Sequence, residues 1–267
     1  MTREEAGARL WLCDVSSVTD PALLETYQRL LDHAEKERLR RFRFDKDRHV
    51  FLVSHALLRA TLSRVTGCAP EDLRFGKGAH GKPLLLDTHG QPTASPAFNL
   101  SHSGPFAVVA VDERAGAIGV DVEYHRPGRR FDALAVRHFA CAERQHLAAQ
   151  DTTARAACFY DIWTLKEAYI KARGAGLSMP LDEFAFSFTP GAIGFTAEPG
   201  LDPAPGRWRF WCARIGGDAS LSLAVDPGIG DECFAGPRLF RTVPLGECHP
   251  VIVDQTVGQS PSSPPCA

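Results

Sequence analysis

The sequence lacks three features that mark common classes of protein. No apolar run approaches the length that spans a membrane, the formal net charge at pH 7 is only −2, and the cysteines form no C-x-x-C pair. These absences argue against an integral membrane protein and a general polyanion binder. The stretch MTREEAGARLWLCDV has acidic residues where a signal peptide needs a basic and then an apolar segment, so we expect a cytoplasmic protein. The eight cysteines lie mostly among apolar residues and are expected to be buried, reduced thiols rather than a metal or disulfide framework: positions 13, 68, 141, 158, 212, 233, 248 and 266.

The composition that remains is that of a globular chain. Its 267 residues are 44% hydrophobic, enough for one large domain or two small ones. A helix is predicted to begin at Asp20-Pro21, since aspartate caps helices and proline opens them, and a second helix is predicted to end at Gly67. Short runs with a period of two follow, and PFAVVAVDERAGAIGVDVE predicts a hairpin that turns at 113–116.

This order of elements is then repeated. Helices are predicted again at about 131–150 and 154–173, strands follow, and both series end in AVD, at 110–112 and 224–226. We therefore predict an α+β fold of two similar halves, 1–114 and 115–226.

After residue 226 the chain becomes rich in proline and forms a C-terminal extension, 227–267. Residues 236–253 are expected to pack as an extended strap, whereas the terminal GQSPSSPPCA is expected to be disordered. Deleting 254–267 should on this interpretation change the thermal stability little.

The stretch IGVDVEYH, residues 118–125, contains an unusual strand. Ile118, Val120 and Val122 alternate as expected for a strand with one face on a core, which places Asp121 and Glu123 side by side on the other face. Two neighbouring carboxylates repel each other unless water, protons or a cation relieve the repulsion. A solvated strand face is the ordinary explanation, and a cation site is the functional one.

A further acidic residue lies in the predicted helix ACFYDIWTLKEAYIKARGAGL. Glu167 lies four residues after Trp163 and so shares the buried face of the helix, where a carboxylate needs a partner or a cation. Lys171, one turn further on, is the expected partner. An ordinary i,i+4 ion pair on an exposed face is the alternative.

The stretch FNLSHSG, residues 98–104, indicates an anion site. Ser101, His102 and Ser103 end an apolar strand just before a Gly-Pro turn, where hydroxyl, imidazole and backbone N–H groups can receive a phosphate. Neighbouring strand residues point oppositely and there is no G-x-S-x-G elbow, which argues against a hydrolase triad. Lys77, Lys82 and the basic run KERLRRFRFDKDR at 36–48 are available to help, although such residues are often only a solvated surface.

These stretches together, from about residue 35 to 188, closely resemble the 4′-phosphopantetheinyl transferases of the surfactin-synthetase-activating type. The strongest elements are the G-x-D-x-E strand at 119–123 and the helix motif WTLKEAYIK at 163–171. The resemblance implies two similar α+β halves, related by a pseudo-twofold axis, with the active site in the cleft between them. It also implies Mg²⁺-dependent transfer of the phosphopantetheine arm of coenzyme A to a serine of an apo acyl or peptidyl carrier protein, with release of adenosine 3′,5′-bisphosphate. The carriers would serve fatty acid, polyketide or nonribosomal peptide synthesis.

The resemblance also implies roles for individual residues. Asp121, Glu123 and Glu167 would hold the magnesium ion, and Glu167 could instead, or in addition, be the general base. Lys171 would bind phosphate and stabilise the leaving group. The expected coenzyme A contacts are Lys82, Ser101, His102 and Lys171, with Arg48, Lys77 and Lys166 as weaker candidates.

Two other classes of function stay open from the residues alone. One is a different Mg²⁺-dependent enzyme that acts on a nucleotide diphosphate. The other is a noncatalytic nucleic-acid-binding module built on 36–48, where Phe42 and Phe44 interleave with the basic residues. For the transferase we expect a monomer with no nucleic-acid or membrane partner.

Overall fold

The computed structural model describes residues 7–126, 131–228, 234–251, 253 and 255–261. Its helices and strands follow one another in two series and a C-terminal extension. The first series is β1 (Arg9–Asp14), α1 (Pro21–Leu30), α2 (His33–Arg40), α3 (Asp45–Thr66), β2 (Arg74–Lys77), β3 (Pro83–Leu86), β4 (Ala97–Ser103) and β5 (Phe106–Asp112). The second is β6 (Ala117–Tyr124), α4 (Phe131–His138), α5 (Cys141–Ala148), α6 (Thr152–Arg173), β7 (Phe184–Thr189), β8 (Gly191–Ala197), β9 (Arg209–Ile215) and β10 (Ala219–Asp226). The extension adds β11 (Arg238–Thr242), β12 (Cys248–Pro250) and β13 (Gln255–Gln259).

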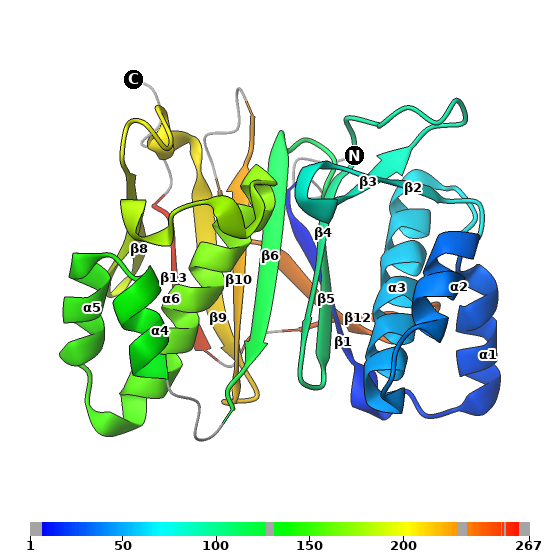
Figure 1. Ribbon diagram of the computed structural model, residues 1–267, viewed down its shortest axis with the longest axis horizontal. Helices are drawn as coiled ribbons and strands as arrows, with labels where there is room; N and C mark the ends of the chain where they lie inside the picture. The colour runs from blue at the N-terminus through cyan, green and yellow to red at the C-terminus, as the bar shows by residue number, and fades with distance from the viewer. Residues whose placement is uncertain (1–6, 127–130, 229–233, 252, 254, 262–267) are drawn as a thin grey trace.

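Two mixed sheets occupy the middle of the molecule and helices flank them, α1–α3 on one side and α4–α6 on the other (Figure 1). The first sheet has the strand order β12-β11-β1-β5-β4 and the second β6-β10-β9-β13-β8-β7. The two series are built alike, because β1-β5-β4 in the first sheet corresponds to β6-β10-β9 in the second, and each series has one further hairpin. The predicted α+β fold of two similar halves is confirmed.

Strand alternation divides the apolar residues between separate cores. Leu10 and Leu12 of β1 join Val120 and Val122 of β6 in a core between the two sheets. Trp11, the intervening residue of β1, faces α1–α3 instead. Because successive strand side chains point to opposite faces, one strand can serve both cores. The same alternation turns Asp121 and Glu123 toward α6.

Local signals predicted the helix ends well. Asp20 caps α1 by accepting a hydrogen bond from the N–H of Ala22, and Pro21 is the first helical residue. Gly67 ends α3 with a φ of 73°, in the left-handed region that glycine adopts without steric cost. The single helix predicted at 131–150 is two helices, α4 and α5.

The predicted hairpin at 113–116 is wrong in one respect. The chain does turn there, but β5 and β6 belong to different sheets, and β6 pairs along its length with β10. The turn therefore carries the chain from the first sheet to the second. Alternation showed that β6 is a strand but held no information about its partner.

The C-terminal extension is more ordered than predicted. β11 pairs with β1 in the first sheet, and β13 lies between β9 and β8 in the second. Ser260, which was expected to be disordered, is buried and exchanges hydrogen bonds with the backbone of Phe210. The prediction of disorder is therefore wrong for 258–260, because backbone pairing does not require apolar side chains, and its remainder at 262–267 lies outside the described residues. No helix in the described part of the chain is both long and apolar enough to cross a membrane.

Candidate functional site

The two halves meet where β4 of the first sheet lies beside β6 of the second (Figure 1). We call this contact the seam. Side chains of β4, rather than its backbone, bond to the facing edge of β6. The pairs run from β4 acceptor to β6 amide: Asn99 Oδ1 to the N–H of Val120 (2.9 Å), Ser101 Oγ to the N–H of Val122 (3.4 Å) and Ser103 Oγ to the N–H of Tyr124 (3.2 Å).

Gly119 explains why α6 comes so close to β6. A Cβ at this position would lie 2.0 Å from the carbonyl oxygen of Ala168 and 2.4 Å from the amide nitrogen of Ala172. Only glycine leaves room for this contact. The close approach places Glu167 and Lys171 of α6 over the strand face that carries Asp121 and Glu123.

Asp121 is the most buried of the acidic residues that were predicted for the site. Its Oδ1 accepts hydrogen bonds from Ser101 (2.8 Å) and from the ammonium of Lys171 (2.6 Å). Its Oδ2 is buried without a hydrogen-bond partner among the described residues. Glu123, two residues further on, accepts a hydrogen bond of 2.8 Å from Ser103.

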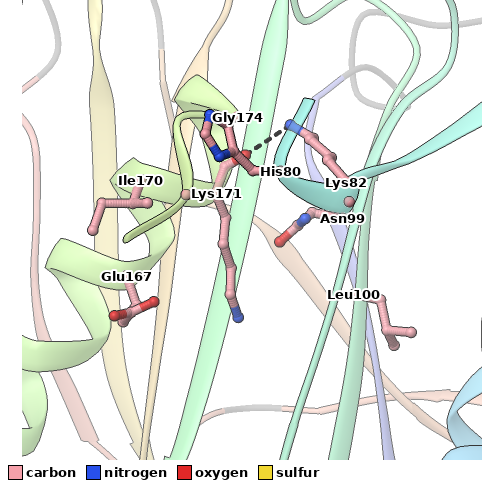
Figure 2. A pocket seen from close by; sticks show the side chains of 10 residues that line it. His80, Lys82, Asn99, Leu100, Glu167, Ile170, Lys171 and Gly174 are labelled. Atoms are coloured by element: carbon pink, nitrogen blue, oxygen red, sulfur yellow. Dashed lines mark hydrogen bonds between the residues drawn. The ribbon is translucent and has the colours of Figure 1, made fainter. Parts of the chain in front are cut away.

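Glu167 completes the group of carboxylates. Burial raises its pKa to about 7, with further contributions from the charges of Asp121 and Glu123 that outweigh the opposing charge of Lys171. Glu167 and Lys171 both extend from α6 into the pocket (Figure 2). The predicted ion pair between them is not the one that forms, because Lys171 bonds to Asp121, Ser101 and the carbonyl of Val120 instead.

Two hollows follow one another along β4. A cavity of about 250 Å³ is lined by Lys82, Asn99, Glu167 and Lys171, among others. A larger one of about 820 Å³ is lined by residues of both halves, which include Arg38, Lys46, His102, Ser103, Glu123 and Arg126. The carboxylates of Glu167 and Glu123 thus border two adjoining spaces that could hold different parts of one elongated ligand.

Lys82 reaches across the seam, and its ammonium group hydrogen-bonds to backbone carbonyls of the second half. It donates to the carbonyl oxygens of Lys171 (2.8 Å), Ala172 (3.3 Å) and Ile118 (3.3 Å), as Figure 2 shows for the end of α6. Burial lowers its pKa to about 8. An ammonium has three N–H donors, and here all three bond to carbonyls of the second half. Lys82 therefore has no N–H group left over for the coenzyme A contact that was predicted for it.

The other predicted ligand contacts fall in three places. His102 lines the larger hollow, and its pKa is lowered by partial burial and by the positive charges of Lys171, His55 and Arg38. Ser101 lies inside the seam with its hydroxyl engaged by Asp121 and Lys171. Arg48 contacts Asp45 and the carbonyl of Phe42 in its own segment.

The prediction for Lys166 is wrong. Its ammonium is fully buried on the far side of α6, where it pairs with Glu143 (2.8 Å) and donates to the carbonyls of Leu181 and Phe184. Positions 166 and 171 differ by five residues on the helix, which turns them to different faces. Lys77 of β2 is exposed and, like Arg48, is not among the described residues that line the two hollows.

Several residues of the site were missed as individuals. Arg38 and Lys46 belong to the basic run that sequence reasoning had singled out, but nothing in that run distinguishes them from their neighbours. Ser103 was predicted to belong to the anion site with Ser101 and His102, but its bond to Glu123 was not predicted. Arg126, beyond the end of β6, gave no signal.

The donor set fits an open magnesium site better than a closed one. No group of three or more His, Cys, Asp or Glu side chains among the described residues is arranged to enclose a metal ion. However, Mg²⁺ usually takes one or two carboxylates together with waters and substrate phosphates. The unpartnered Oδ2 of Asp121 and the raised pKa of Glu167 both indicate uncompensated negative charge that a cation would relieve.

Comparisons with known proteins show the family of the chain. The family described as "4'-phosphopantetheinyl transferase superfamily" matches residues 117–225, and "4'-phosphopantetheinyl transferase, N-terminal" matches residues 20–114. These matches divide at the turn that carries the chain between the sheets.

Curated relatives carry the same name. The 4′-phosphopantetheinyl transferase Sfp of Bacillus subtilis is 35% identical over 60% of this chain and 68% of its own length. A Synechocystis sp. protein whose name proposes the same activity is 37% identical over 66% of this chain and 68% of its own length. A solved structure, a Chronobacterium ammoniagenes ACPS–CoA complex, shares 20% identity over 41% of this chain and 94% of its own, with a TM-score of 0.31.

Proposed function

The chain belongs to the 4′-phosphopantetheinyl transferase family, of the Sfp type, and from this premise we propose that the seam between its halves is the active site. The enzyme transfers the 4′-phosphopantetheine group of coenzyme A to carrier proteins. The observation that carries our assignment of the site is the meeting of Asp121 and Glu123 from β6 with Glu167 and Lys171 from α6. We propose that these three carboxylates border an open Mg²⁺ site, at which one or two of them bind the ion directly while waters and substrate phosphates complete its coordination.

A bound Mg²⁺ would neutralise charge on the diphosphate of coenzyme A, and the chain's own residues would supply positioning and proton transfer. The incoming serine oxygen forms a bond to the phosphorus of the phosphopantetheine group. The bond from that phosphorus to the oxygen of adenosine 3′,5′-bisphosphate breaks. We propose that the ammonium of Lys171 offsets the negative charge that develops on this leaving oxygen.

Glu167 is our candidate for the group that accepts the serine proton. A general base works best when its pKa lies near the working pH, and burial raises the pKa of Glu167 to about 7 in the metal-free protein. Glutamate at its ordinary value of 4.5 would be a weaker base.

The larger hollow suits the anionic part of the substrate. Arg38, Lys46 and His102 line it, and we propose that they receive phosphates of coenzyme A. We propose that Lys82 joins the two halves at the end of α6 and does not contact the ligand directly. The cytoplasmic location and the monomeric state expected from the sequence belong to the same proposal, and gel filtration would test the second.

The test is mass spectrometry of several apo acyl and peptidyl carrier proteins incubated with this enzyme, coenzyme A and Mg²⁺. Each accepted carrier should gain the mass of one phosphopantetheine group. Chelation of the metal and the substitution Asp121→Ala should each abolish the gain while the protein stays folded. Modification by Asp121→Ala at the wild-type rate would remove the metal assignment, and no modification of any carrier would count against the site as a whole.

A further inference from the structure

The seam contacts share one register. Asn99, Ser101 and Ser103 lie two residues apart on β4, and each accepts a hydrogen bond from an amide 21 residues further along the chain. The two strands therefore run side by side in the same direction with a fixed alignment. β6 would otherwise present these N–H groups unpaired at the edge of its sheet.

The two serines of the seam each make a second hydrogen bond, to a carboxylate, and Asn99 has no such carboxylate partner. Ser101 donates to Asp121 and Ser103 donates to Glu123, both at 2.8 Å, and each carboxylate lies 20 residues after its serine. The residue 20 positions after Asn99 is Gly119, which has no side chain to receive a bond. The bond from a β6 amide to a β4 side chain therefore occurs three times along the seam, and a bond to a carboxylate accompanies it only at Ser101 and Ser103.

Each of the two serine hydroxyls accepts from an amide and donates to a carboxylate. A hydroxyl has one proton and can accept as well as donate. Because the N–H of Tyr124 donates to the oxygen of Ser103, the hydroxyl proton is left for Glu123. Ser103 is only 8% exposed, so the protein, more than the solvent, orients this hydroxyl.

We infer that Ser103 is a positioning residue that aims the carboxylate of Glu123 at the metal site, as Ser101 does for Asp121. The inference rests on the metal assignment of the proposed function. Outer partners of metal-binding carboxylates fix the orientation of those carboxylates, and their loss commonly weakens metal binding by about 10–100-fold. Ser103 is the better test of the two, because Ser101 also bonds to Lys171.

The experiment measures Mn²⁺ binding to the enzyme by electron paramagnetic resonance, with and without saturating coenzyme A and in the absence of carrier protein, and melting curves beside it. Ser103→Ala should bind Mn²⁺ about tenfold more weakly than wild type. Ser103→Thr keeps the hydroxyl and should bind nearly as wild type. Asn99→Ala is the matched control, because it also leaves a seam amide without its acceptor but removes no carboxylate contact. Both alanine variants should lose similar melting temperature, and only Ser103→Ala should lose Mn²⁺ affinity.

Equal Mn²⁺ affinity in Ser103→Ala and wild type would overturn the inference while leaving the metal assignment in place. Equal losses of affinity in Ser103→Ala and Asn99→Ala would also overturn it, since a loosened seam would then explain both. If Ser103→Ala fails to fold, Ser103→Val against Ser103→Thr compares side chains of equal shape with and without the hydroxyl. A wild-type protein that binds no Mn²⁺ either with or without coenzyme A would remove the metal assignment together with this inference, and the carrier assay would still judge the transferase activity separately.

Discussion

The protonation state of the Glu167 carboxyl group should determine how the activity depends on pH. If this group accepts the serine proton, activity should fall as the pH drops through the pKa of Glu167, because the base becomes protonated. A bound Mg²⁺ would lower that pKa from its metal-free value of about 7. Glu167→Gln keeps the size of the side chain but cannot act as a base, so we expect turnover to fall by roughly a hundredfold or more. Turnover measured against pH checks this. A wild-type profile that does not fall anywhere below pH 7, together with a Glu167→Gln variant of normal rate, would contradict it.

The same residue should also affect stability. The folded protein binds the Glu167 proton more tightly than the unfolded chain, since the pKa rises from 4.5 to about 7 on folding. The metal-free protein should therefore lose stability as the pH rises from about 4.5 through 7, and Glu167→Gln should flatten this slope. Denaturant unfolding at several pH values without metal measures it. Parallel slopes in the two proteins would show that Glu167 titrates normally.

Lys166 and Lys171 allow a matched comparison within one helix. Lys166→Met leaves Glu143 buried without its ion-pair partner and should cost about 3–5 kcal/mol of stability. Lys171→Met removes a cation from the site, so turnover should fall by about a hundredfold, with a smaller loss of stability because this side chain is partly exposed. Melting curves and turnover for both variants check the two roles. A catalytic defect in folded Lys166→Met as deep as that in Lys171→Met would contradict the assignment.

Among the elements, the contact of β6 with α6 holds the site together. Gly119→Ala would drive a methyl group into the backbone of α6, and we expect a cost at or above the upper end of the usual 1–3 kcal/mol range for overpacking, with loss of activity. Gly116→Ala is the control, because its Cβ would meet nothing closer than 3.8 Å and the change should stay within about 0.5 kcal/mol. Chemical unfolding of both variants measures the difference. Similar stabilities would show that the helix can shift away from the strand at little cost.

On the scale of the whole molecule, the C-terminal extension contributes to both sheets. Deleting 255–267 removes β13 from between β9 and β8, and exposes the edge of β9 at Trp211 and Ala213. We expect a drop of several degrees in melting temperature, since a chain of this size loses about 2–4 °C for each kcal/mol. A chain that ends at residue 261 keeps β13 and the Ser260 bonds and should melt as the full chain does. Equal melting temperatures for both truncations would instead support the prediction from the sequence that the tail contributes little to stability.

The sequence by itself determined the local features of this protein. Aspartate before proline and glycine after a helix marked the ends of α1 and α3, because caps depend on neighbouring residues alone. Alternation placed Val120 and Val122 toward a core and Asp121 and Glu123 on the opposite face, because side-chain direction in a strand has a period of two. The family motifs placed Glu167 and Lys171 on one helix.

Tertiary structure decided which of these groups meet. Lys171 bonds to Asp121 in place of Glu167, Lys82 bonds to carbonyls of the second half, and Lys166 points to the opposite side of its helix. β6 pairs with β10, about 100 residues away, and the proline-rich tail joins both sheets. Periodicity fixes the face on which a side chain lies, but the partner of that side chain depends on how distant segments pack. This packing depends on the apolar core that the two sheets bury between them, to which many segments contribute.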